Sequence, residues 1–79
     1  MPGFDRITFN PQVMGGRACI RGQRITVSLV LKLVADGMTS AEILAAYPYL
    51  ELEDIYECLR YAAWLADENV YPIESQSAA

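Results

Sequence analysis

Two helix-breaking residues, Gly37 and Pro48, divide most of the chain into three helical segments. Before Gly37, apolar residues recur at intervals of three and four, which is the period of a helix and predicts one over about 27–36. Glycine suits the position just after a helix, and proline forces the residue before it out of helical geometry. We therefore predict a second short helix over about 40–47 and a third, longer one over about 52–68.

The three predicted helices meet the core in different ways. The first is apolar except for one line of polar residues, Ser28, Lys32 and Asp36, so we place it at the centre of the core. The second begins with a capping box, in which the side chains of Thr39 and Glu42 accept each other's backbone amides. The third is predicted to face the core through the stripe Leu52, Ile55, Leu59, Ala62 and Ala66.

The residues before the first helix predict a small β element. Residues 7–9 have high β propensity, and Pro11 stops the strand just after them. Glycines at 15–16 can supply a reversal, and one or two further short strands are predicted around a turn at Gly22. The result is a β ribbon over about 5–25, which is too small to be stable alone.

The length of the chain limits it to one domain. A chain of 79 residues holds one core, because two cores would each fall below the length that folds unaided. We assign this domain to residues 1–68 and expect a flexible tail over 69–79, where the helical period ends. Apolar residues make up 53% of the chain, which exceeds what so small a monomer needs to fill its interior. The excess predicts a subunit interface and a homodimer.

Charge divides the chain into a basic head and an acidic body. Residues 1–35 carry five cations and one carboxylate, whereas residues 36–79 carry nine carboxylates and one cation. Three arginines of the head, Arg17, Arg21 and Arg24, lie on the predicted ribbon, where arginines can enter a groove of DNA or hold phosphates. The alternative is that they form salt bridges with the acidic body or with a sister subunit. Both interpretations stay open, with these three arginines as the candidate DNA-binding residues.

The three helices have the layout of a helix-turn-helix unit, which occurs in proteins that bind DNA and in bundles that bind only proteins. The third helix opens with acidic side chains, and these would repel the phosphates that normally drive affinity for DNA. They are Glu51, Glu53, Asp54 and Glu57. We therefore expect any contact with DNA to come mainly through the arginines of the ribbon.

A second candidate surface lies on the third helix. Tyr61 and Trp64 fall on one line with Glu57, with Arg60 beside it, and this line is predicted to face away from the core stripe. Large aromatic residues are enriched where partners bury surface, so we assign these four residues to a partner-binding face. The alternative is that the aromatic residues pack against a folded-back tail at 71–73.

Catalysis finds little support in the sequence. The chain has no histidine, and its neighbouring acidic pairs, such as Glu53 with Asp54, point in different directions on a helix. The two cysteines are far apart and form no CxxC pair, so we expect no metal or cofactor and no enzymatic activity. Reduced thiols, the lack of a signal peptide and the lack of a long apolar run predict a cytoplasmic protein that does not enter a membrane.

Two segments carry a family resemblance, GGRACIRGQRI at 15–25 and YPYL at 47–50. In this order and spacing they resemble the domain of unknown function 433 family of bacteria and archaea, over about residues 5–66. Two positions depart from the family pattern: Ala18 stands where proline is frequent, and Glu51 stands where threonine often caps the third helix.

The resemblance implies a mainly α, homeodomain-like three-helix bundle with an N-terminal β element. It also implies a non-catalytic antitoxin of a type II toxin-antitoxin system, whose usual partner is a PIN-like ribonuclease toxin, with operator DNA as a second partner. The acidic body would suit such a toxin, because complementary charge speeds association. The competing interpretation is an oligomeric protein-interaction module that binds no nucleic acid.

Overall fold

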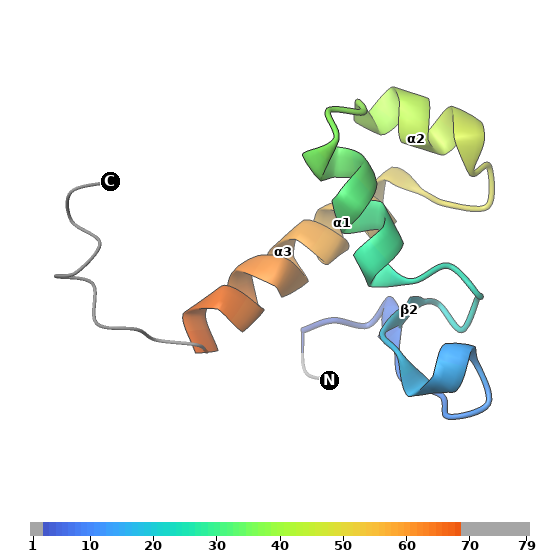
Figure 1. Ribbon diagram of the computed structural model, residues 1–79, viewed down its shortest axis with the longest axis vertical. Coiled ribbons are helices and arrows are strands. Elements are labelled where there is room, and N and C mark those ends of the chain that lie inside the picture. Colours follow the sequence, from blue (N-terminus) through green and yellow to red (C-terminus); the bar gives the residue numbers. More distant parts are fainter. Residues whose placement is uncertain (1–2, 69–79) are drawn as a thin grey trace, which may run out of the picture.

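The computed structural model describes residues 3–68 and shows three helices with a small sheet at the N-terminal side (Figure 1). The sheet consists of β1 (Ile7–Thr8) and β2 (Cys19–Ile20), with a 3-10 turn at Met14–Gly16 between them. The helices are α1 (Val27–Ala35), α2 (Ser40–Ala46) and α3 (Leu52–Glu68). The chain is therefore mainly α, and the predicted helix bounds agree with the structure to within one residue. The predicted tail lies outside the described residues.

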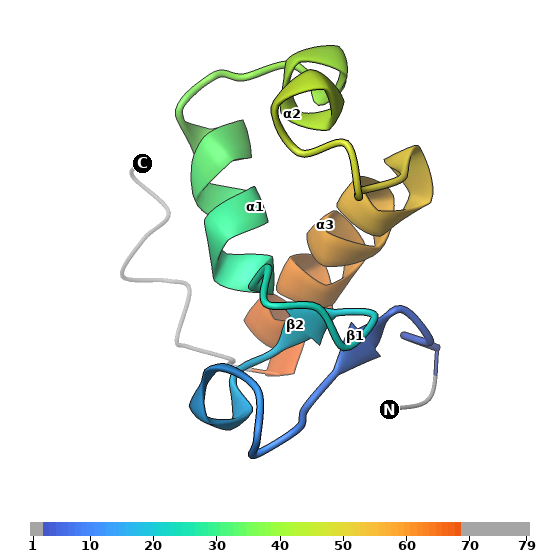
Figure 2. The same ribbon diagram turned by 90° about the vertical axis from the view of Figure 1, so that its right-hand side faces the viewer.

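The sheet is a single antiparallel pair. Ile7 lies opposite Ile20 and Thr8 opposite Cys19. After a tight turn in which Arg21 and Gly22 have φ angles of 47° and 74°, the chain returns past the sheet and adds one isolated bridge from Cys19 to Thr26. The strand predicted after Gly22 is thus reduced to one bridge. Figure 2 shows the sheet across the lower ends of α1 and α3.

Side-chain caps fix where the two short helices begin. The Thr26 hydroxyl accepts a hydrogen bond from the amide of Leu29 at the start of α1, at 3.1 Å. At the start of α2, Thr39 accepts from the amide of Glu42 at 3.1 Å, and the Glu42 carboxylate accepts from the amide of Thr39 at 2.8 Å. The predicted capping box is confirmed. Between the two helices, Gly37 takes a left-handed conformation with φ 93°, which glycine adopts without strain.

The core lies between the three helices and the sheet. Its fully buried side chains include Ile20 from β2, Val27 and Val30 from α1, Ile43 from α2 and Ile55 from α3. The predicted polar line of α1 is exposed, and Leu31 and Leu33 are half-buried against the core. α1 therefore occupies the central position that its composition predicts.

The predicted core face of α3 is wrong in part. Leu52 and Leu59 are each 40% exposed, whereas Cys58 is fully buried and Tyr61 is 9% exposed. The buried face of α3 is rotated because it also buries two carboxylates, Asp54 and Glu57, which meet charged or polar groups of the N-terminal segment. An apolar pattern cannot identify a face that includes charged residues.

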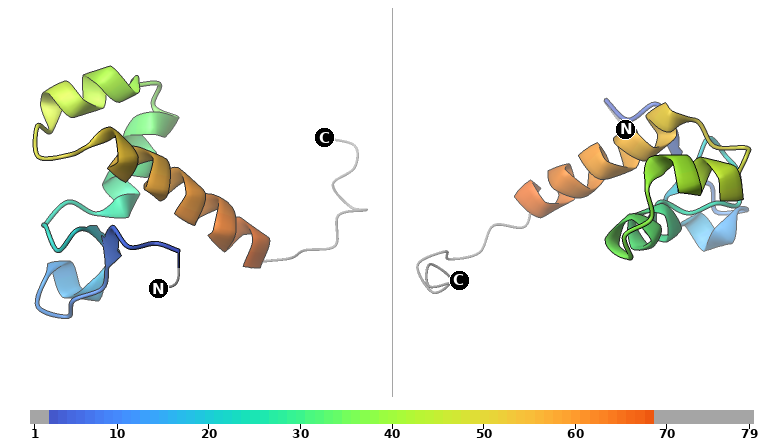
Figure 3. Two further views of the ribbon diagram at one scale, coloured as in Figure 1. Left: turned by 180° about the vertical axis from the view of Figure 1, so that it is seen from behind. Right: turned by 90° about the horizontal axis from the view of Figure 1, so that it is seen from above.

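The last turns of α3 extend beyond the other helices. Views from behind and from above both show this part of the helix running away from α1 and α2 (Figure 3). Within residues 3–68, no helix is long and apolar enough to cross a membrane.

Candidate functional site

Asp54 is the centre of a buried ion cluster that joins the N-terminal segment to α3. Its side chain is fully buried and accepts hydrogen bonds from both Nε and Nη2 of Arg21, at 3.1 and 3.0 Å. Nη1 of Arg6 donates to the same carboxylate at 2.9 Å and to the carboxylate of Glu51 at 2.7 Å. The forked contact from Arg21 is the geometry in which a guanidinium holds a carboxylate most firmly.

The same cluster fixes where α3 begins. Asp54 accepts a hydrogen bond from the amide of Glu51 at 2.8 Å, so it satisfies a donor that the helix itself leaves open. Arg21 also donates to the carbonyl of Tyr49 at 2.8 Å, and the amide of Arg6 donates to Glu57. Although Glu51 is a poor cap by its residue type, Asp54 satisfies its backbone amide and stabilises the helix start.

The cluster sets the charge state of Asp54. Burial by itself raises the pKa of this carboxyl, but hydrogen bonds from Arg21, from the Glu51 amide and from Arg6 outweigh burial and hold the pKa below its ordinary value. The hydrogen bonds that the guanidiniums donate also raise their own pKa. Arg6 donates to Glu51 and to Asp54, and Arg21 donates to Asp54. Asp54 is therefore ionised and fully engaged at neutral pH.

The three arginines predicted to meet DNA separate into two kinds. Arg21 forms the ion pair described above, so the salt-bridge interpretation holds for it. Arg17 and Arg24 are exposed, and within residues 3–68 neither forms an ion pair. Their guanidiniums are available to a ligand or a partner.

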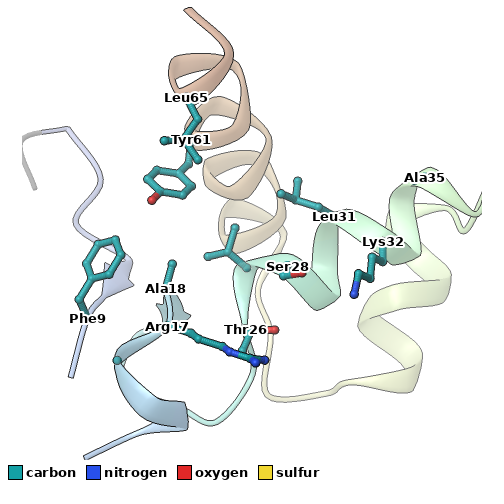
Figure 4. A pocket seen from close by; sticks show the side chains of 12 residues that line it. Phe9, Arg17, Ala18, Thr26, Ser28, Leu31, Lys32, Ala35, Tyr61 and Leu65 are labelled. Atoms are coloured by element: carbon teal, nitrogen blue, oxygen red, sulfur yellow. The ribbon is translucent and has the colours of Figure 1, made fainter. Parts of the chain in front are cut away.

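Arg17 lies at the edge of a cavity of about 640 Å3 between the ribbon, α1 and α3 (Figure 4). One side of the cavity is apolar, with Phe9, Tyr61 and Leu65 in the close view. The other side mixes apolar residues such as Leu31 and Ala35 with polar ones and carries two cations, Arg17 and Lys32, with no acidic residue in the lining. We call this cavity the cationic groove.

The cationic groove was missed in the sequence because its residues come from three separate segments. Phe9 follows β1, Lys32 lies on α1, and Leu65 lies near the end of α3. One signal was present: Ser28 and Lys32 lie four residues apart on the polar line of α1, and both line the groove. The sequence alone gave no reason to join that line to Arg17.

The predicted partner-binding face on α3 is corrected by the structure. Glu57 is 6% exposed and Tyr61 is 9% exposed, so neither lies on an outer face. Tyr61 packs edge to face on Phe4 at 5.5 Å between ring centroids and stacks on Trp64 at 6.0 Å. Within the described residues, Phe4 covers Tyr61. The predicted alternative, a contact with 71–73, lies outside the described residues.

Two members of that face remain accessible. Trp64 is 40% exposed, and its ring lies 5.8 Å from that of Phe4. The side chain of Arg60 is 56% exposed and forms a long ion pair of 3.7 Å with Glu57. Tyr61 meets the cationic groove from the buried side of α3, whereas Arg60 lies on the outer side of the helix.

A second, smaller cavity of about 340 Å3 lies beside Arg24 and is also lined by Gln23, Ile25 and Tyr49. The side-chain oxygen of Gln23 is buried without a hydrogen-bond partner in the described part of the chain. Tyr49 is 66% exposed, so this cavity is shallow and open. It contains one cation where the cationic groove contains two.

Neither cysteine is placed to react. Cys19 and Cys58 are both free and buried. Burial, together with the nearby carboxylates of Asp54 and Glu57, raises the pKa of the Cys58 thiol to about 12. The thiol is therefore protonated at neutral pH and is a poor nucleophile.

Comparisons with known proteins agree on one family. The model of the family described as "Protein of unknown function (DUF433)" matches residues 7–62, which include Arg21, Glu51 and Asp54 of the ion cluster, but not Arg6, and most of the cationic groove. The fold is similar to the crystal structure of a DUF433 member from Anabaena variabilis ATCC 29413, with a TM-score of 0.72 and 31% sequence identity. The similarity covers 94% of this chain and 69% of that one. No curated protein matches the chain.

Proposed function

The chain belongs to the DUF433 family, whose description names no function, and we propose that it is a non-catalytic protein that acts by holding another protein in the cationic groove. The observation that carries the proposal is the groove itself. It combines an apolar wall with two cations, Arg17 and Lys32, that form no ion pair within residues 3–68, and its lining contains no carboxylate to neutralise them. Such a lining fits an apolar segment of a partner that carries an acidic side chain.

The groups that most resemble reactive residues support a binding role. Asp54 is held by two arginines and a backbone amide, so it has no lone pair free to take a proton from a substrate. The Cys58 thiol is buried and protonated. Both side chains contribute to the fold and neither faces the groove.

The partner that the family resemblance favours is a PIN-like ribonuclease toxin, which makes the chain an antitoxin-like protein. A ribonuclease needs a basic surface to hold RNA. α3 presents exposed carboxylates at Glu53 and Asp67, which would oppose such a surface. In this account the groove holds a segment of the toxin while the acidic side of α3 faces its RNA-binding surface.

Operator DNA is the second partner of the proposal, in keeping with a homeodomain-like arrangement of α2 and α3 as a helix-turn-helix unit. Arg17 and Arg24 support it, because both are exposed and without an ion pair in the described residues. Arg21 does not, because it is bound to Asp54. DNA would therefore be held by the ribbon and not by the acidic start of α3.

The alternative is an oligomeric protein-interaction module that binds no nucleic acid. The engagement of Arg21 and the exposed Glu51 and Glu53 at the start of α3 favour it over direct readout of DNA. Under either proposal the protein works as a homodimer. Two buried, unpaired cysteines suit the reducing cytoplasm, which is where we place it.

Co-expression tests the toxin proposal. The product of the neighbouring gene is expressed with and without this chain, and the mass of the complex and its ribonuclease activity are measured. We expect a stable complex in which the nuclease is inhibited. A genome in which no nuclease-like gene lies beside this one, or a nuclease that stays fully active and unbound, contradicts the proposal.

A further inference from the structure

The outer face of α3 carries an apolar seam that the described part of the chain leaves uncovered. Leu52, Tyr56 and Leu59 are 40%, 43% and 40% exposed, and Ala63 and Ala66 are exposed as well. These five residues follow one another at intervals of four and three, which is the heptad spacing of helices that pair side by side. We call them the α3 seam.

The seam lies on the side of α3 away from its buried residues. Ile55 and Cys58 face the core, and Tyr61 and Leu65 face the cationic groove. With 3.6 residues per turn, the seam lies opposite Tyr61 and borders the core face of the helix at Ile55. A partner on the seam would therefore leave the groove open.

Charges beside the seam indicate which partner fits it. Glu53 and Arg60 are both exposed, have opposite charge, and lie one heptad apart on the same flank of the seam. When two copies of such a helix pair in antiparallel orientation, this flank meets itself, and Glu53 of each copy comes opposite Arg60 of the other. In a parallel pair each of these charges would meet an apolar residue.

We propose that α3 pairs with α3 of a second copy of this chain, antiparallel along the α3 seam, with two Glu53 to Arg60 ion pairs placed symmetrically about the two-fold axis. The same register sets the bulky Leu52 of one copy against the small Ala63 of the other, and Tyr56 against Leu59. Large side chains thus meet small ones at the ends of the seam, and the middle is filled by the two largest pairs.

The shape of the molecule agrees with this pairing. The last turns of α3 extend past the other helices, so they are free to lie along the start of α3 in a second copy (Figures 1 and 3). Tyr49, which precedes α3 and is 66% exposed, would then lie near Ala66 of the second copy. The proposal goes beyond toxin binding and does not depend on it.

Sedimentation velocity over a range of protein concentrations tests the pairing. Glu53→Arg places like charges at two symmetric positions of the dimer and is expected to raise its dissociation constant about tenfold. The double variant Glu53→Arg with Arg60→Glu exchanges the two charges and is expected to restore the wild-type value. Asp36→Arg makes the same change of charge at an exposed site just after α1 and should leave the dimer unchanged.

Arg60→Glu places a second carboxylate beside the buried Glu57 and can disturb folding, so a second variant tests the seam without changing Arg60. Ala63→Glu introduces a charge within the seam and is expected to dissociate the dimer, whereas Ala45→Glu on the exposed side of α2 should not. Circular dichroism confirms that each variant is folded. A wild type that is monomeric at micromolar concentration overturns the proposal. A dimer whose dissociation constant is unchanged by Glu53→Arg and by Ala63→Glu also overturns it. A dimer lost in Lys32→Glu instead would place the interface in the cationic groove.

Discussion

Asp54 holds more of this structure together than any other single side chain in the described residues. It is fully buried, yet it is charged, and its two oxygens serve Arg6, Arg21 and the amide of Glu51. These contacts connect residues 33 and 48 positions apart in the sequence. When one member of a buried ion pair is removed, the other is left as a buried charge without a counter-charge. We therefore expect the loss of any one member to destabilise the whole cluster.

The change Asp54→Asn tests the cluster. The amide keeps the size of the side chain but leaves the two guanidiniums without a counter-charge, and we expect the free energy of unfolding at pH 7 to fall by about 2–3 kcal/mol. Urea unfolding followed by circular dichroism measures it. Asp36→Asn, at an exposed position on the end of α1, is the matched control and should change stability by less than about 0.5 kcal/mol. An equal effect of both changes would contradict the role given to Asp54.

The pH dependence of stability gives an independent check. Because the pKa of Asp54 is lower in the folded state than its ordinary value of 3.8, its stabilising contribution is complete above that pH and is lost as the pH falls through the folded value. We expect the gap in unfolding free energy between the wild type and Asp54→Asn to be constant from pH 7 to 5 and to narrow below about pH 4. A gap that is unchanged at pH 3 would show that the carboxylate charge is not what stabilises the fold.

At the scale of the helices, residue pattern predicted bounds well and orientation poorly. The period of apolar residues, Gly37, Pro48 and the Thr39 cap are local signals, and the helices begin and end close to where these signals place them. The face that α3 buries depends on Asp54 and Glu57, whose partners lie in the N-terminal segment, and no local signal reveals those partners. For the same reason the sequence grouped Arg21 with Arg17 and Arg24, and it could not join Lys32 to Arg17.

The capping box of α2 provides the prediction at this scale. Thr39→Ala removes the hydroxyl that accepts from the amide of Glu42, and we expect a loss of about 1 kcal/mol in the free energy of unfolding. Ser40→Ala changes the neighbouring hydroxyl, which is not the cap, and is the control. Thermal and urea unfolding of the two variants should differ clearly. Similar stability of the two would mean that the cap contributes little to this short helix.

For the molecule as a whole, the arginines without an ion pair in the described residues are the ones expected to contact DNA, and they determine how strongly binding would depend on salt. If the chain binds the DNA upstream of its own gene, the logarithm of affinity should fall with the logarithm of salt concentration, and Arg17→Ala or Arg24→Ala should each reduce the slope by about one. Arg21→Ala should instead lower the stability of the fold, because it breaks the Asp54 cluster. Fluorescence anisotropy over a salt series measures the slopes, and no binding at low salt would leave the protein-interaction module as the function.

The central claim is that the cationic groove holds the partner protein, and isothermal titration of the nuclease that we propose as this partner, with matched charge variants of the chain, tests it most directly. Lys32→Glu and Arg24→Glu make the same change at two exposed cations, the first inside the groove and the second outside it. We predict that Lys32→Glu weakens binding at least about tenfold, as expected for a charge placed against a like charge, while Arg24→Glu binds as the wild type does. Equal binding by all three proteins would contradict the account.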